Sequence, residues 1–140
     1  MNNLALDKEL MFKAIEEAKR GIPHVYPNPA VGCVIHDGGK ILSTGYHKMF
    51  GGDHAEHDAL QKLDKSARGL TMYVSLEPCF KANSCCAKKI ISKGIKRVVI
   101  SSLDPNPQIY GKGVKFLKSK GVKVLLAGAR QNKFKQINKF

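Results

Sequence analysis

Two short segments contain the residue types that bind a transition metal and move protons. The first has His54 with Glu56 two positions later, and the second has Pro78-Cys79 with Cys86 further along. One imidazole and two thiolates suit Zn²⁺, and three protein ligands leave a fourth tetrahedral position open for water. Four protein ligands would close the site and make it structural. The pattern therefore predicts a catalytic zinc centre.

Glu56 is predicted to carry protons in this centre. Bound zinc lowers the pKa of a water molecule to about 7. A carboxylate beside the metal could take the proton of that water and pass it to a ring nitrogen and a departing amine. An H-x-E pair alone also fits a solvated helix start, but its combination with Pro-Cys and a later Cys is typical of zinc-dependent nucleobase deaminases. His57 could share the face of His54, but three better-placed ligands make it a neighbour of the site or a solvent-facing residue.

Two adjacent cysteines compete for the third ligand position. The usual spacing is Pro-Cys-x-x-Cys, whereas Cys85 and Cys86 lie six and seven positions after Cys79. We favour Cys86, because residues 87–91 continue from it as a helix whose positive N-terminal end would favour a thiolate. Cys85 is the alternative. Cys33 lies in an apolar run and is predicted to be a small buried hydrophobic residue.

Residue periodicity predicts one α/β domain over residues 1–140. A hairpin turn at 37–40 is followed by strands that alternate with helices, which is typical of a largely parallel sheet with helices on both faces. We therefore expect a three-layer αβα sandwich around a five-stranded mixed sheet. Ligands of such sheets bind outside the carboxyl ends of the strands, where Cys79 and residues 104–107 fall. Helices are expected over 7–20 (with Asp7 as N-cap), 54–63, 86–93 and 114–120, strands over 30–36, 41–46, 71–76, 97–101 and 122–126, and a polar tail with room for a short helix over 129–140.

Composition and charge narrow the class of protein further. The chain has 140 residues, of which 43% are hydrophobic, so it can bury a core. Its apolar runs are shorter than the roughly 20 residues of a membrane span, and its start does not resemble a signal sequence. We expect a cytoplasmic protein without a membrane partner. Residues 1–70 hold nine basic and nine acidic side chains, whereas residues 71–140 hold fifteen basic and two acidic ones. A basic second half would attract a phosphorylated small molecule or nucleic acid. A lysine-rich coding bias is the alternative explanation.

Motifs outside the metal pattern carry a family resemblance over nearly the whole chain. They are P-N-P-A-V-G-C-V-I at 27–35, G-Y-H at 45–47, S-L-E-P-C at 75–79, G-I-K-R-V-V at 94–99 and D-P-N-P at 104–107. Together with His54-Ala55-Glu56 they resemble the pyrimidine deaminase of riboflavin biosynthesis, which forms the N-terminal half of a bifunctional deaminase/reductase.

The resemblance implies a cytidine deaminase-like fold with Zn²⁺ as cofactor. It implies hydrolytic deamination of 2,5-diamino-6-(5-phosphoribosylamino)pyrimidin-4(3H)-one to the 5-amino-uracil ribotide, with release of ammonia. It also implies that Asn28, His47, Asp104 and Asn106 bind substrate, and polar groups of these types suit a polar ring and a ribose. Asn28 and Asn106 could instead be plain turn residues.

Two departures from the family pattern have consequences. The family loop between the zinc cysteines usually reads S-H-x-G-[KR]-T-P-P and is two residues longer than residues 80–85 here. Its basic residue corresponds to Lys81, expected near the substrate phosphate, and the shortening could reduce affinity or activity. Residue 140 falls about where the family's reductase would begin, and no dinucleotide-binding pattern is present. We therefore expect the reductase step on a separate subunit or in a longer parent chain, and we expect homo-oligomers, which are common in this fold class.

Other functions remain open at this stage. A tRNA adenosine deaminase would share the fold and the metal and would suit a basic surface. The long spacing between the cysteines and the D-P-N-P motif argue against it, so a nucleic-acid partner is not expected. A deaminase of cytosine nucleosides or nucleotides is a further alternative. A non-catalytic scaffold for a separate reductase would not need Glu56.

Overall fold

The computed structural model describes residues 4–80, 85–126 and 138. Its elements lie in the order α1 (Leu4–Lys19), β1 (Gly32–His36), β2 (Ile41–Tyr46), α2 (Ala55–Lys62), β3 (Thr71–Leu76), α3 (Cys86–Ser92), β4 (Arg97–Ser102), α4 (Lys112–Ser119) and β5 (Lys123–Leu126). All the predicted helices and strands over the described residues are present, with ends shifted by up to three residues. The predicted tail over 129–140 lies outside the described residues except for Asn138.

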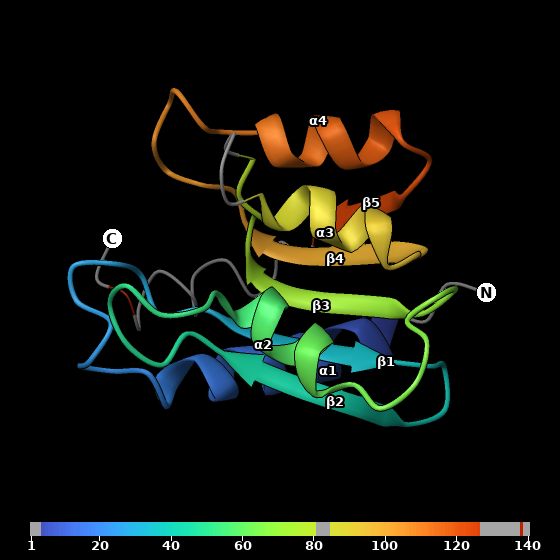
Figure 1. Cartoon of the computed structure of the whole chain (residues 1–140), viewed down its shortest axis with the longest axis horizontal. Helices are drawn as coiled ribbons and strands as arrows, with labels where there is room; N and C mark the ends of the chain where they lie inside the picture. The colour runs from blue at the N-terminus through green and yellow to red at the C-terminus, as the bar shows by residue number, and fades with distance from the viewer. Residues whose placement is uncertain (1–3, 81–84, 127–137, 139–140) are drawn as a thin grey trace.

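The five strands form one mixed sheet in the order β2-β1-β3-β4-β5. Strand β1 is antiparallel to both β2 and β3, and the parallel pairings are β3 with β4 and β4 with β5. The sheet is therefore less parallel than the alternation of strands and helices suggests, because the chain returns from β2 through α2 to the far side of β1. The predicted five-stranded mixed sheet and three-layer αβα architecture are confirmed (Figure 1).

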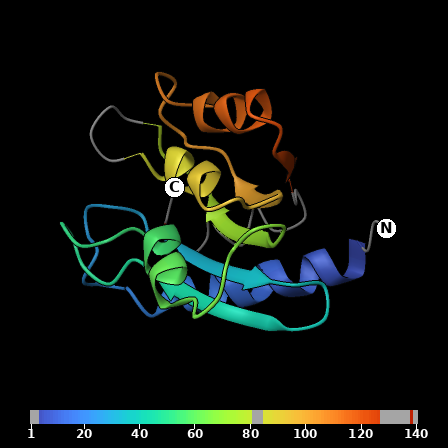
Figure 2. The same ribbon diagram turned by 45° about the vertical axis from the view of Figure 1, so that its right-hand side comes forward.

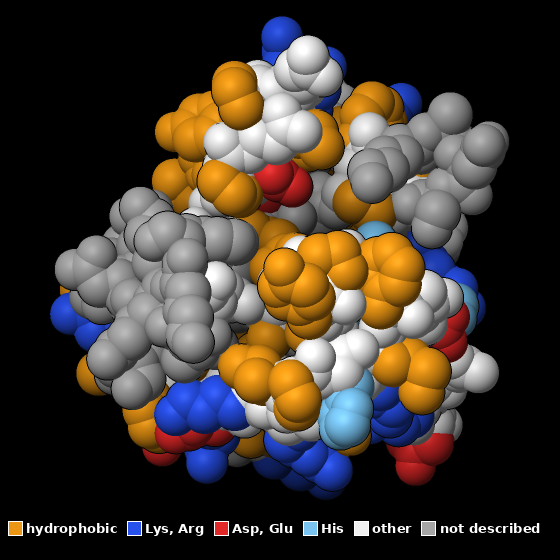
Figure 3. Space-filling view, turned by 90° about the vertical axis from the view of Figure 1, so that its left-hand side faces the viewer, with side chains coloured by type: hydrophobic (Ala, Val, Ile, Leu, Met, Phe, Trp, Pro, Cys, Tyr) orange, Lys and Arg blue, Asp and Glu red, His pale blue; other side chains and the backbone are white. Residues whose placement is uncertain are grey.

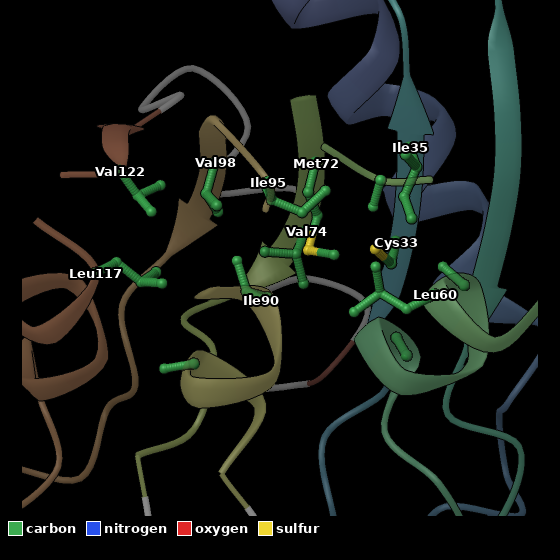
Figure 4. Packing of buried hydrophobic residues seen from close by; sticks show 14 of the residues in the cluster. Cys33, Ile35, Leu60, Met72, Val74, Ile90, Ile95, Val98, Leu117 and Val122 are labelled. Atoms are coloured by element: carbon green, nitrogen blue, oxygen red, sulfur yellow. The ribbon is translucent and has the colours of Figure 1, made fainter. Parts of the chain in front are cut away.

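Helices cover both faces of the sheet. In Figure 1, α2, α3 and α4 lie on the near face and α1 crosses the far face, and the turned view of Figure 2 separates these layers. The larger core cluster joins the near-face helices to the sheet, and it includes Leu60, Val74, Ile90 and Leu117 (Figure 4). A second cluster joins α1 to the other face through Met11, Ile15 and their neighbours. Within the described residues, no helix is long and apolar enough to cross a lipid bilayer.

Asp7 does not cap helix α1, and that prediction is wrong. It lies inside the helix and is 6% exposed. Its carboxylate accepts a hydrogen bond from the Tyr73 hydroxyl at 2.6 Å and forms an ion pair with Arg97. The acidic side chain is used to join α1 to β3 and β4 rather than to start the helix.

One end of the sheet collects the segments that carry the predicted site. Gly32 at the start of β1 pairs with Tyr46 at the end of β2, and Leu76 at the end of β3 pairs with Ser102 at the end of β4. The Gly32 N–H also donates to the Ser75 hydroxyl at 3.0 Å. The residues before β1 and those after β2, β3 and β4 therefore meet at one edge of the molecule.

Candidate metal centre and active site

Three side chains converge at this edge as a potential metal centre. The donor atoms of His54, Cys79 and Cys86 lie within 4.8 Å of one another. His54 is the residue preceding α2, Cys79 follows β3, and Cys86 begins α3. Two helix starts and one strand end thus place the three donors, as the sequence analysis predicted.

The spacing of these donors fits a tetrahedral metal ion. The His54 Nδ1 atom lies 3.3 Å from the Cys86 Sγ atom and 3.7 Å from the Cys79 Sγ atom. Zn–N and Zn–S bonds at a tetrahedral angle would separate a nitrogen from a sulfur ligand by about 3.6 Å. The donor set and its spacing therefore suit a zinc site with three protein ligands.

Cys85 has a different role from its neighbour. Its sulfur accepts a hydrogen bond from the Lys88 backbone N–H at 3.3 Å and so caps the N-terminus of α3. Its thiol also points to the Cys79 carbonyl oxygen at 3.6 Å. Cys85 lies outside the group of donors that could hold a metal, and its sulfur is already engaged by the helix.

The pKa values of the two cysteines of the centre are shifted in opposite directions. Hydrogen bonds from the Cys86 thiol and backbone N–H and from His54 lower the pKa of Cys79 to about 4, against the effect of burial. The pKa of Cys86 is raised by its hydrogen bond to Cys79 and by burial. The two pKa shifts have opposite directions because two adjacent thiolates repel each other and the pair shares one proton.

Glu56 lines the same cavity as His54 and Cys79 and is 4% exposed. Burial raises its pKa to about 7, although its own backbone N–H and the charge on His54 act in the opposite direction. A carboxyl group that titrates near neutral pH can both accept and deliver a proton. Glu56 is therefore buried beside the potential metal donors, and its proton-transfer role stays a prediction.

The cavity has a volume of about 170 Å³ and collects residues from four separate segments. Figure 3 faces this edge of the molecule, where one small acidic patch lies among hydrophobic side chains. Four predicted site residues outside the predicted metal group line it, namely Asn28, His47, Glu56 and Asp104. Its other walls are Pro29, Val31, His54, Ala55, Leu76, Glu77, Cys79 and Ile109.

His47 and Asn28 are linked by a hydrogen bond inside the cavity. The His47 ring, 3% exposed, has its Nδ1 atom 2.8 Å from the Asp53 carbonyl oxygen and its Nε2 atom 3.2 Å from the Asn28 Nδ2 atom. Since a carbonyl oxygen only accepts, Nδ1 carries the proton, and Nε2 accepts from the Asn28 amide. This arrangement fixes the tautomer of His47 and turns the amide oxygen of Asn28 to its other side.

The remaining predicted residues are placed differently. Asn106 is exposed and does not line the cavity; its side-chain oxygen accepts from the Gln108 N–H at 3.0 Å, as a turn residue would. Lys81 lies outside the described residues. His57 is not in the donor group and contacts Lys89 and Asp53 instead. Cys33 is fully buried, as predicted.

The sequence analysis gave no role to Glu77, which is 4% exposed and accepts hydrogen bonds from the backbone of Asp104, Gly111 and Val114. The charge pattern of the sequence could have singled out Glu77. Glu77 and Asp104 are the two acidic residues of the strongly basic segment 71–140, and both lie at the cavity.

Comparisons with known proteins agree with the fold and the site. A family model described as the cytidine and deoxycytidylate deaminase zinc-binding region matches residues 4–102. The chain therefore belongs to the zinc-binding cytidine and deoxycytidylate deaminase family, and the predicted resemblance to the riboflavin-pathway branch is confirmed by its relatives.

One curated relative is the diaminohydroxyphosphoribosylamino-pyrimidine deaminase of Buchnera aphidicola subsp. Schizaphis graminum, which is 48% identical over 120 residues, covering 84% of this chain and 82% of the relative. Among solved structures, Acinetobacter baumannii RibD superposes with a TM-score of 0.93 at 38% identity and covers 98% of this chain. A deaminase/reductase from Thermotoga maritima, named for diaminohydroxyphosphoribosylaminopyrimidine deaminase and 5-amino-6-(5-phosphoribosylamino)uracil reductase, superposes with a TM-score of 0.90 at 37% identity over 97% of this chain. The chain spans 39% and 40% of those two chains.

Proposed function

We propose that this protein hydrolytically deaminates 2,5-diamino-6-(5-phosphoribosylamino)pyrimidin-4(3H)-one, with zinc held by His54, Cys79 and Cys86. The observation that carries the proposal is the convergence of these three donors at the cavity that is lined by His54, Cys79 and the buried Glu56. The relative of nearly the same length, 48% identical, is named for this deamination.

When bound, zinc would supply Lewis-acid activation of a water molecule. In the reaction, a carbon–oxygen bond to water forms at the amidine carbon of the ring, the carbon–nitrogen bond to the amino group breaks, and ammonia leaves. Glu56 takes one proton of the water and delivers it to the ring nitrogen. It then takes the remaining proton from the new hydroxyl group and delivers it to the departing amine, so that a ring carbonyl and ammonia result. Burial, which raises the pKa of Glu56 to about 7, allows both directions of transfer near neutral pH.

Two polar side chains, those of Asn28 and Asp104, orient the ring. The Asn28 amide donates to His47 Nε2, so its oxygen is the end that would accept an N–H of the substrate. The Asp104 Oδ1 atom accepts from the Asn106 N–H at 2.9 Å, which leaves the other carboxylate oxygen for the substrate. Asn106 contributes by forming this turn.

The ribose phosphate would extend into an adjoining cavity of about 500 Å³. The two cavities share Asn28 and His54, so a ligand can continue from one to the other. Lys89 lines the second cavity and offers a cation for the phosphate, and Lys81 remains a predicted phosphate ligand outside the described residues. A homo-oligomer, a cytoplasmic location and a reductase, on a separate subunit or in a longer parent chain, remain part of the proposal.

The test is ammonia release by the zinc-loaded protein from the ribotide, with CMP, cytidine and tRNA offered in parallel. We expect release from the ribotide and none above background from the other three. Inosine formed in tRNA would replace this proposal with a tRNA adenosine deaminase, and release from CMP or cytidine would replace it with a cytosine deaminase. No release from any substrate, with zinc bound, would favour a non-catalytic scaffold.

A further inference from the structure

The carboxylate of Glu77 receives three backbone N–H groups from one distant segment. Its Oε1 atom accepts from Asp104 at 3.1 Å and from Gly111 at 2.9 Å, and its Oε2 atom accepts from Val114 at 3.1 Å. The side chain is 4% exposed, and in the described part of the chain no lysine or arginine forms an ion pair with it. A buried carboxylate is costly unless it is well hydrogen-bonded, and here the backbone supplies the bonds.

Glu77 also replaces a cap that helix α4 lacks. The residue at the N-cap position is Gly111, with φ of 78° and no side chain to accept the first-turn N–H groups. These groups and the positive end of the helix favour a nearby anion. A Cβ atom on Gly113 would lie 2.1 Å from the Pro78 carbonyl oxygen, so the start of α4 rests directly on the segment that contains Glu77.

The same carboxylate closes both ends of the loop at 103–111. Asp104 lies at the start of this loop and Gly111 at its end, and one oxygen of Glu77 binds both N–H groups. Asp104, at the first of these anchors, and Ile109, between the two, line the active-site cavity. Cys79 follows Glu77 by two residues, so the anchor of the loop and a proposed metal ligand belong to one short segment.

We propose that Glu77 is a positioning residue that holds the 103–111 loop, and with it Asp104, in a fixed place relative to the metal ligands. It acts on substrate affinity through Asp104 and does not bind the metal. The kinetic part of this inference rests on the proposed ribotide deamination, whereas the structural part does not.

The structural part is tested first on the wild-type protein by amide hydrogen exchange. The N–H groups of Asp104, Gly111 and Val114 lie in a loop and a first helical turn, where exchange is ordinarily fast. The proposal predicts that all three are protected. Fast exchange at these positions, with the amides of β3 and β4 protected, would overturn it whether or not the protein has the proposed activity.

The second arm is the Glu77→Gln variant, in which one of the two acceptor oxygens is replaced by a donor. Because hydrogen bonds to a charged group are lost, amide exchange at Asp104, Gly111 or Val114 should become faster by about tenfold or more. The KM for the ribotide should rise by about tenfold. The kcat value and the zinc content should stay close to those of the wild type. Glu16→Gln, the same change on the exposed face of α1, should alter none of these. An unchanged KM, or a loss of kcat and zinc at unchanged KM, would overturn the positioning role.

Discussion

The Nδ1 atom of His54 lies 3.3 Å from the Sγ atom of Cys86, although 32 positions separate the two residues. The neighbouring Cys85 instead caps α3 through its sulfur. We therefore assign Cys86, and not Cys85, as the metal ligand, and this assignment can be tested by substituting each cysteine in turn.

Cys86→Ser should abolish stable zinc binding and turnover, because a serine hydroxyl is a poor ligand for zinc compared with a thiolate. Cys85→Ser is the matched control, since serine is a favourable N-cap and should keep the helix. Zinc content after dialysis, measured by atomic absorption, gives the answer. Zinc lost from the Cys85→Ser variant but kept by the Cys86→Ser variant would reverse the ligand assignment.

Glu56→Gln should remove turnover while leaving fold and zinc in place. Burial raises the pKa of Glu56 to about 7, so a neutral amide of the same shape does not remove a strongly stabilising charge. Loss of a proton-transfer group predicts a kcat lower by at least about 100-fold. The measurement is ammonia release at saturating ribotide, with Glu16→Gln as control. Turnover close to that of the wild type would refute the proton-transfer role.

The Asp7–Arg97 ion pair predicts a specific dependence of stability on pH. Burial acts to raise the pKa of Asp7, but hydrogen bonds from Arg97 and Tyr73 outweigh it, so the pKa is lowered. A carboxyl group with a depressed folded-state pKa stabilises the fold above its unfolded pKa of about 3.9, and the contribution is lost as the pH falls through the folded value.

Asp7→Asn should therefore lower the free energy of unfolding at pH 7 by about 2 to 4 kcal/mol, because Arg97 is left without its partner. Below pH 4 the difference from the wild type should shrink. Urea unfolding at several pH values checks this, with Asp64→Asn, at an exposed position, as control. A difference that stays constant from pH 7 to acidic pH would contradict the ionic contribution.

Close packing of α1 on the sheet depends on Gly32. A Cβ atom there would lie 1.8 Å from the Ala14 carbonyl oxygen, so helix and strand would have to separate. Gly32→Ala should cost about 3 kcal/mol or more by overpacking, whereas Gly39→Ala, whose Cβ would meet its nearest atom at 3.6 Å, should change little. Thermal unfolding of both variants tests the contact. Equal melting temperatures would show that the helix can move without cost.

The sequence predicted the elements and the metal group because both depend on local patterns. Strand ends, helix starts and the H-x-E and Pro-Cys motifs place His54, Glu56 and Cys79 near one another once a sheet is assumed. The antiparallel pairing of β1 with β3 could not be predicted in this way, because pairing depends on where the chain returns and not on the pattern inside either strand.

Asp7 and Glu77 show the same limit of prediction from local sequence patterns. Asp7 has the residue type of a helix cap, but its partners Tyr73 and Arg97 are 66 and 90 positions away, and nothing near Asp7 in the sequence indicates them. Glu77 binds backbone N–H groups, which every residue has, so no partner side chain reveals its role. The feature of the sequence that could have indicated a role for Glu77 was its negative charge within a basic segment.

The most direct test of the account is a zinc titration of the metal-free protein followed by ammonia release from the ribotide. The account predicts no release without metal and a rate that rises with bound zinc to a plateau at about one ion per chain. Full release by the metal-free protein, or a zinc-loaded chain that leaves the ribotide unchanged, would contradict it.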